Sequence, residues 1–422
     1  MKCRLKVLKN KLNLLTVFLP SLESATVSVW IKTGSRNEKD EMLGLSHFLE
    51  HMAFKGGKKY PSAKAVSEAI DQVGGEFNAS TSKEVTQYYV RIRSKLIKKA
   101  FDVLSDIVLQ PNLDCKEIKK EKDVIIEEMN MYEDTPVRRI WDLFEQLIFE
   151  GHPLGRDIIG TKDTLKKLER GDFISYRNEF YKSGNLLISV AGGFDQDLVE
   201  DLADKYFSAI QEGKKDFDLK KPVLEKRKIS LTTKDVEQAH MILGFPAEPF
   251  GSMNRYKDAV LNAILGSGMS SRLFLEVRER RGLAYAIRSD FERFADAGYF
   301  AVYAGVDPNK TQEAIKVILD ELYGLASGEK KIKGKELEKG KEYIKGNLAL
   351  SLEDTRGVSG FFGYEQLMLG RVRSPDEVFE NIDRVVCEDI YNQAKNIFRK
   401  ENLKISIIGP FKNESEFVKI LE

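Results

Sequence analysis

The sequence is poor in cysteine and histidine for its 422 residues. Its three cysteines, Cys3, Cys115 and Cys387, are odd in number and far apart, so they form neither a disulfide framework nor a paired metal-binding motif. This sparing use of cysteine favours a reducing compartment. We therefore expect a cytoplasmic protein.

Long apolar runs and an excess of charge of one sign are also missing. No stretch of about 18 apolar residues occurs, so no membrane-spanning helix is expected. Near the N-terminus the apolar stretch 14–19 is short and ends in Pro20, which does not fit a secretory signal peptide. The 67 Lys and Arg residues against 66 Asp and Glu leave a net charge of +1. This balance gives no basic field for nucleic acid, and we expect neither a nucleic-acid nor a membrane partner.

The length indicates more than one domain, because a single hydrophobic core rarely serves a chain of this size. The segment 212–228 is charged, contains Pro222 and lies near the middle of the chain. We interpret it as a linker between a first domain, residues 1–211, and a second domain, residues 229–422.

The two halves follow the same predicted order of strand, helix, helix, strand, strand and helix. In the first half the alternating strand Ala25–Ser35 is followed by a helix around 43–54 and a second helix capped by Ser62. In the second half the strand 240–248 and the helix 256–265 stand in the corresponding places. This order predicts an α+β fold of two homologous domains, each a mostly antiparallel sheet packed by helices.

Two of the four histidines lie in one five-residue stretch, His47-Phe48-Leu49-Glu50-His51. Residues four apart on a helix share a face at about 6 Å, so both imidazoles can reach one metal ion. Glu50 projects from the same face and can hold a water beside that ion without binding it. The alternative is a surface helix that carries two histidines and no metal.

A catalytic zinc site needs a third protein ligand. The candidates lie in the acidic segment 114–134, where Asp114 and Glu117 mark a helix start. Glu121 and Glu128 are two helical turns apart and share a stripe, whereas Glu127 lies about 100° away from Glu128. Periodicity alone leaves all three glutamates open.

The motif His-x-x-Glu-His is that of the inverzincins, the reverse of the commoner His-Glu-x-x-His zinc helix. Together with GGEFNASTSKEVTQYY, EKDVIIEEMNMYEDTP and LFLEVRERRGLAYAI, it closely resembles the pitrilysin (insulinase-like) metallopeptidases. Within this family, the sequence looks most like the bacterial proteins that are similar to the mitochondrial processing peptidase. The resemblance spans nearly the whole chain.

The resemblance implies one Zn²⁺ per chain, held by His47, His51 and Glu128, which lies 77 residues beyond His51. It implies that Glu50 is the general base and later the general acid, and that Glu121 orients one of the two histidines. Which histidine Glu121 orients does not follow from the sequence. The second half has no such motif, so each chain is expected to carry one site.

The resemblance also implies how a peptide is held. The substrate would lie extended along the edge strand 75–80, with Asn78 and Ala79 facing it. Arg278 and Tyr285 would contact the substrate carbonyl and stabilise the oxyanion. The alternatives are an ordinary edge strand and a basic helix followed by a buried tyrosine.

The function expected from the resemblance is a zinc endopeptidase that acts on short or unfolded peptides. Larger relatives join four such domains in one chain, so two chains of this length are expected to associate as a homodimer. A heterodimer with an inactive homologue is the second possibility. The competing function is a non-catalytic binding or assembly subunit. Non-catalytic relatives usually lose motif residues, whereas this chain keeps all five: His47, Glu50, His51, Glu121 and Glu128.

The run between Lys330 and Gly346 contains many lysines and glutamates at helical spacing. Such a run is typical of the solvated face of a helix. We assign it no function from the sequence.

Overall fold

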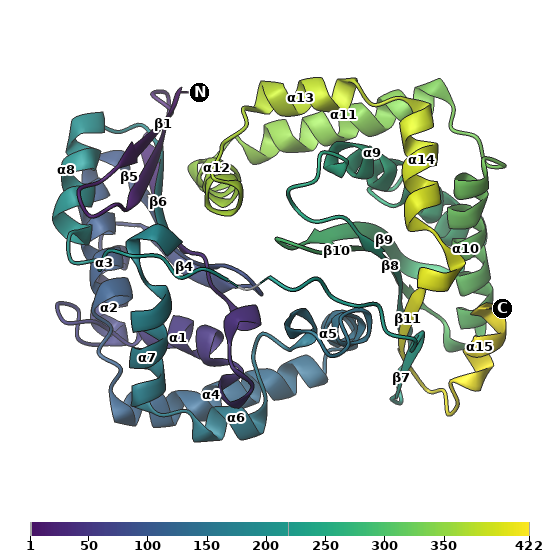
Figure 1. The fold of residues 1–422 in the computed structure, drawn as a ribbon, viewed down its shortest axis with the longest axis horizontal. Coiled ribbons are helices and arrows are strands. Elements are labelled where there is room, and N and C mark those ends of the chain that lie inside the picture. Colours follow the sequence, from purple (N-terminus) through teal and green to yellow (C-terminus); the bar gives the residue numbers. More distant parts are fainter. Residues whose placement is uncertain (1, 218, 422) are drawn as a thin grey trace. The chain divides into compact units, whose positions relative to one another are not determined.

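The computed structural model describes residues 2–217 and 219–421. The chain folds into two compact units, each built around one sheet (Figure 1). The first unit comprises Met1–Met129, Arg156–Asp218 and Leu350–Arg373, and the second comprises Asn130–Gly155, Leu219–Ala349 and Ser374–Glu422. This architecture confirms the predicted α+β fold with two domains.

The sheet of the first unit has six strands in the order β1-β2-β6-β3-β5-β4. All neighbours pair antiparallel except β2 and β6, which are parallel. Strand β4 pairs only with β5, so it forms one edge of the sheet. The strands are β1 Lys2–Val7, β2 Asn13–Phe18, β3 Ser24–Ile31, β4 Glu76–Thr81, β5 Thr86–Arg93 and β6 Leu186–Gly192.

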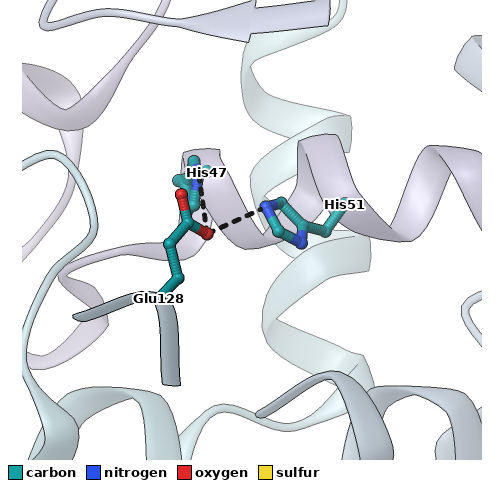
Figure 2. A group of neighbouring side chains, drawn as sticks. All are labelled: His47, His51 and Glu128. Carbon is teal, nitrogen blue, oxygen red and sulfur yellow. Dashed lines mark ion pairs between the residues drawn. The ribbon is translucent and has the colours of Figure 1, made fainter. Parts of the chain in front are cut away.

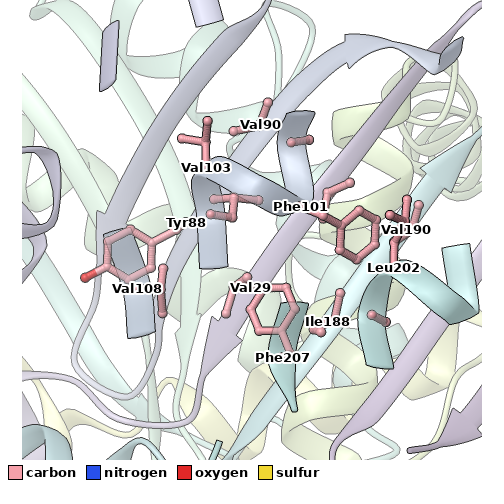
Figure 3. Close-up of a cluster of buried hydrophobic side chains, with 14 of the residues drawn as sticks. Val29, Tyr88, Val90, Phe101, Val103, Val108, Ile188, Val190, Leu202 and Phe207 are labelled. Atoms are coloured by element: carbon pink, nitrogen blue, oxygen red, sulfur yellow. The ribbon is translucent and has the colours of Figure 1, made fainter. Parts of the chain in front are cut away.

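Helices pack on this sheet through fully buried side chains. Phe101 of α3 and Phe207 of α8 meet at a centroid distance of 6.3 Å above Val29, Val90 and Ile188 of the strands (Figure 3). Burying each such side chain stabilises the fold by roughly 1.5–3 kcal/mol. The helices of this unit are α1 Leu45–Phe54, α2 Ala63–Asp71, α3 Ile97–Leu109, α4 Cys115–Glu133, α6 Lys162–Lys167, α7 Arg170–Phe180, α8 Gln196–Phe207 and α12 Thr355–Leu369.

The sheet of the second unit has five strands in the order β7-β11-β8-β10-β9, with only β7 and β11 parallel. Strand β9 is one of its edges. The strands are β7 Ile229–Thr233, β8 Ala239–Ala247, β9 Ala284–Arg293, β10 Gly298–Val306 and β11 Lys404–Gly409. The helices are α5 Pro136–Ile148, α9 Arg255–Leu265, α10 Thr311–Ser327, α11 Gly334–Ser351, α13 Pro375–Asp383, α14 Cys387–Ile397 and α15 Ser415–Leu421.

Each half of the chain contributes one helix to the unit built mainly by the other half. Helix α12 packs on the first sheet, where Ser359 lies 2.9 Å from Ser28 and 2.7 Å from Ser189, oxygen to oxygen. Helix α5 packs on the second sheet, where Phe144 contacts Tyr299 at a centroid distance of 5.2 Å. The compact units therefore differ in these two segments from the division into residues 1–211 and 229–422. Local periodicity identifies an amphipathic helix but not the distant sheet that it covers.

The segment that carries Arg278 is helical, but it is wound more widely than an α-helix. Residues Phe274–Glu279 form a π-helix, and the Arg280 amide donates to the Leu275 carbonyl five residues earlier at 2.9 Å. Such π-helical turns are rare and are found disproportionately at functional sites.

No helix in the described ranges is both long and apolar enough to cross a membrane. The side chains of Cys3 and Cys115 are exposed, that of Cys387 is partly exposed, and all three are free thiols.

Two glycines of α12 provide a test of its packing. A Cβ at Gly363 would lie 2.6 Å from the Trp30 ring nitrogen, whereas a Cβ at Gly360 meets nothing within 4 Å. We expect Gly363→Ala to lower the melting temperature because the buried indole must move. Gly360→Ala should raise it, since alanine favours a helix by up to about 1 kcal/mol over glycine. Equal shifts for the two variants in thermal unfolding would contradict this packing.

Candidate metal centre

Helix α1 carries the His-x-x-Glu-His motif, and a buried carboxylate anchors its N-terminus. Glu38 accepts hydrogen bonds from the backbone amides of Gly44 at 2.7 Å and Ser46 at 2.6 Å. These amides have no partner within the helix, so Glu38 satisfies donors that would otherwise be buried and unpaired. Burial raises the pKa of Glu38 to about 7, although both hydrogen bonds favour its charged form.

Helix α1 divides its side chains between two faces. Leu45, Phe48, Leu49 and Met52 are buried in one apolar cluster that also contains Ile125 and Met129 of α4 and Phe173 of α7. His47, Glu50 and His51 occupy the positions between them and point away from this cluster. The apolar cluster therefore fixes α1 against α4 and sets the direction of the three polar side chains.

Glu128 of α4 reaches the two histidines of α1 (Figure 2). Its Oε2 lies 3.5 Å from Nε2 of His51 and 3.9 Å from Nε2 of His47. One ligand atom from each of the three side chains lies within 4.8 Å of the other two. Among the described residues this is the one group of three or more His, Cys, Asp or Glu side chains with this geometry.

The three donors fit a zinc ion. Zinc bonds of about 2.0–2.2 Å in a tetrahedron separate ligand atoms by about 3.3–3.6 Å, close to the two distances measured here. Two imidazoles and one carboxylate form a donor set that zinc takes in open catalytic sites. Burial, followed by the neighbouring His51, lowers the pKa of His47 to about 4, against the attraction of Glu128. His47 is therefore neutral at neutral pH, which is the form that binds metal.

Glu121 contacts His51 rather than His47. Its Oε1 lies 2.9 Å from Nδ1 of His51, and its Oε2 forms a salt bridge with Nζ of Lys55 at 2.5 Å. A proton on Nδ1 donated to this carboxylate leaves Nε2 of His51 free to bind metal. Burial alone would raise the pKa of Glu121, but His51 and Lys55 outweigh it and hold the pKa below its usual value.

His47 has no comparable support. Its Nδ1 is buried and has no hydrogen-bond partner among the described residues. The sequence left open which histidine Glu121 faces, and in the structure it faces His51. Glu127, the third candidate on α4, is exposed.

Glu50 lines the same cavity as His51 and is held by strand β4. The hydroxyl of Thr81 donates to Oε2 of Glu50 at 2.5 Å. Burial raises the pKa of Glu50, and the hydrogen bond from Thr81 partly offsets this effect. Glu50 and His51 open into a cavity of about 370 Å³ that is also lined by Phe54, Lys55, Ala63, Ser67, Phe77, Asn78 and Glu121.

The edge of the sheet next to this cavity is strand β4. Asn78 is exposed and lines the cavity, whereas Ala79 is partly buried and packs against the core. Oδ1 of Asn78 accepts a hydrogen bond from the backbone amide of Ala79 at 2.8 Å. The predicted edge strand is therefore present, and of the two predicted substrate-facing residues only Asn78 lines the cavity.

Arg278 and Tyr285 lie together in the second unit. The Arg278 guanidinium is 5.5 Å from the centre of the Tyr285 ring and 4.9 Å from that of Phe274. Tyr285 is 72% exposed at the start of edge strand β9, so the alternative of a buried tyrosine is wrong. The side chain of Arg278 is exposed as well.

Sequence reasoning missed three residues of the site, Glu38, Lys55 and Thr81. Lys55 is four residues after His51, and this helical spacing was a usable signal. Glu38 precedes α1 by a loop, and Thr81 lies at the end of a strand. Neither Glu38 nor Thr81 lies at a helical or strand spacing from the His-x-x-Glu-His motif that would have predicted its contact.

The chain matches two family models along its length. The model described as "Insulinase (Peptidase family M16)" matches residues 15–162, and the model "Peptidase M16 inactive domain" matches residues 167–343. An uncharacterized zinc protease of Bacillus subtilis, YmxG, is 38% identical over 93% of this chain and 95% of its own length. An uncharacterized zinc protease of Rickettsia felis is 36% identical over 96% of each chain.

Solved structures show the same fold. A protease from Helicobacter pylori aligns with a TM-score of 0.88 at 24% identity, over 97% of this chain and 99% of that one. A chain of Pseudomonas fluorescens, described as a peptidase M16 inactive domain, aligns with a TM-score of 0.91 at 17% identity. This second alignment covers 98% of the present chain and 99% of the other.

Removal of any one ligand should abolish tight zinc binding. We expect one Zn²⁺ per wild-type chain and almost none in His47→Ala, His51→Ala or Glu128→Gln, because two donors are too few to hold the ion. Elemental analysis of purified protein measures this. Glu127→Gln is the matched control and should keep its zinc. Full occupancy in Glu128→Gln would show that the third ligand is another residue.

Glu121→Gln should weaken zinc binding without abolishing it. The amide keeps the size of the side chain but loses the charge that faces His51 and Lys55, and loss of such support costs about 10- to 100-fold in metal affinity. Competition with a chromophoric chelator measures the affinity. The control is Glu117→Gln, on the same helix and paired with Lys120. Unchanged affinity in Glu121→Gln would remove this role.

Proposed function

Because the chain belongs to the insulinase (M16) family of peptidases, we propose that it is a zinc-dependent endopeptidase that hydrolyses peptide bonds in short or unfolded peptides. The observation that carries this proposal is the convergence of His47, His51 and Glu128, with Glu50 beside them. A structural zinc site would need a closed set of four ligands, and these three leave one position open.

Zinc bound by the three ligands would supply a water of lowered pKa and polarise the carbonyl of the scissile bond. Glu50 lies on the same helical face and is not one of the three ligands. It takes the proton from the attacking water and returns it to the leaving amine, acting first as base and then as acid. Thr81 keeps the Glu50 carboxylate in place through its hydroxyl.

The substrate would bind as an added strand on the free edge of β4. Main-chain hydrogen bonds to an edge give affinity for an extended peptide without demanding a particular sequence. The Ala79 amide bonds to the Asn78 side chain, and an incoming peptide carbonyl would replace that side chain as its acceptor. A folded protein cannot present such a strand, so folded proteins should be poor substrates.

We further propose that two chains associate as a homodimer and that Arg278 and Tyr285 of one chain serve the zinc site of the other. The pair is exposed and prearranged by stacking, which suits contact with a substrate carbonyl and its developing oxyanion. A heterodimer with an inactive homologue would meet the same requirement with one working site.

The Glu50→Gln variant separates chemistry from binding. It should keep its zinc and bind peptide, but lose about 10²–10⁴ in turnover, the usual contribution of a positioned general base. The assay is mass-spectrometric readout of a peptide library, with Glu68→Gln, an exposed carboxylate of α2, as the control. A chelator should stop wild-type cleavage and added zinc should restore it. A purified, zinc-loaded wild type that cleaves no peptide would favour a non-catalytic subunit.

Mixing two inactive variants tests the shared site. Loss of one oxyanion donor costs about 10²–10³ in rate, so Tyr285→Phe and Glu50→Gln should each be nearly inactive. A mixed dimer has one site with both defects and one with neither. Random pairing of equal amounts should restore about a quarter of wild-type activity, by the two-fold symmetry of the assembly. Each variant refolded alone is the control. Mixed dimers that form but stay inactive would contradict a site shared between chains.

A further inference from the structure

Another cavity of the first unit lies against α4, on the side of the helix away from Glu121 and Glu128. It has a volume of about 620 Å³, within the range of small-molecule sites. Five of its eleven lining residues come from the end of α6, the loop after it and the first turn of α7. The other six share one face of α4, centred about 140° around the helix axis from the two glutamates. They are Cys115, Ile118, Lys119, Lys122, Asp123 and Ile126.

The floor of this cavity is apolar. Ile118 and Leu168 are 4% and 2% exposed, and both belong to the apolar cluster that holds α1 against α4. Ile126 is half-buried beside the same cluster, and the free thiol of Cys115 is exposed at the start of α4. A Cβ at Gly171 would meet nothing within 4 Å, so the α7 side of the cavity is open. Such a floor favours a ligand with an apolar body, because burying it removes apolar surface from water.

The rim of the cavity is basic. Four lining residues are lysine or arginine and two are acidic, so the lining carries an excess of two positive charges. Nζ of Lys122 donates to the Lys166 carbonyl at 2.8 Å. Nε of Arg170 donates to the Leu113 carbonyl at 3.1 Å. Lys119 and the side chain of Lys166 are exposed, and in the described part of the chain none of the four cations is paired with a carboxylate. Their charges are therefore available to an anionic group.

We propose that this cavity binds an aromatic carboxylate, with the ring on the apolar floor and the carboxylate against the basic rim. Cations next to an apolar floor attract the face of an aromatic ring as well as a carboxylate, whereas a saturated chain gains apolar contact alone. An inorganic anion would pair with the rim but leave the floor in contact with water. The lining includes no residue of the metal centre, so the site does not depend on the peptidase proposal.

The test is titration calorimetry of 2-naphthoate into the full-length protein, where we expect saturable binding of one molecule per chain. The variant Lys119→Gln/Lys166→Gln should bind at least about fivefold more weakly, since the carboxylate loses two exposed charge contacts. The neutral analogue 2-naphthamide should lose at least about fivefold in affinity for the same reason. The matched control Lys116→Gln/Lys167→Gln changes exposed lysines of the same two helices that do not line the cavity, and should bind like the wild type.

Alkylation of Cys115 shows where the ligand binds. N-ethylmaleimide reacts with exposed thiols, and Cys3 is an exposed thiol of the same chain that does not line the cavity. At a ligand concentration of about ten times Kd, about one chain in eleven is free, so the alkylation of Cys115 should slow about tenfold. The alkylation rate of Cys3 should not change. Mass spectrometry of the digested protein measures both rates.

Two further arms separate this site from other causes of binding. A carboxylate can also bind zinc, so the titration is repeated with His47→Ala, which should give the same affinity. Octanoate, which combines a carboxylate with a saturated chain, should bind more weakly than 2-naphthoate. The proposal fails if no saturable binding occurs, if the two double variants bind equally, if Cys115 is not protected, if His47→Ala abolishes binding, or if octanoate binds more tightly.

Discussion

The approach of Glu128 to the two histidines of α1 is the contact on which the rest of the site depends. Three donors from two helices must meet within the reach of one ion, and neither helix achieves this alone. The apolar cluster around Phe48, Ile125 and Phe173 holds α1 and α4 together on the side away from the donors. Glu38 adds a fixed start for α1, so the helix can neither rotate nor slide without exposing unpaired amides.

The polar groups around the centre are linked through short contacts that each join two elements. Lys55 and Glu121 connect α1 to α4 and fix the ring of His51, while Thr81 connects Glu50 to the edge strand β4. Glu50, His51 and the edge strand β4 are therefore held in one frame. Catalysis by a positioned base depends on this kind of preorganisation, since a displacement of about 1 Å can cost 10²-fold in rate.

Much of the architecture and the positions of His47, Glu50 and His51 on one helix face follow from residue spacing in the sequence. The spacing of His47 and His51 predicts a shared face, and turn signals predict most strand and helix positions. Periodicity could not separate Glu121, Glu127 and Glu128, because the choice depends on how α4 rotates against α1. It could not assign Glu38 or Thr81, which reach α1 only through tertiary folding. The exchange of α5 and α12 is invisible for the same reason, since a helix pattern does not name the sheet that it covers.

X-ray absorption spectroscopy at the zinc edge of the purified wild-type protein tests whether α1 and α4 together hold the metal. We expect a first shell of nitrogen and oxygen alone at about 2.0–2.2 Å, with the multiple scattering of two imidazole rings. A sulfur shell at about 2.3 Å would show that a cysteine binds the metal. A number of bound imidazoles other than two would show that His47 and His51 do not bind it together. Either result would contradict a centre built from α1 and α4.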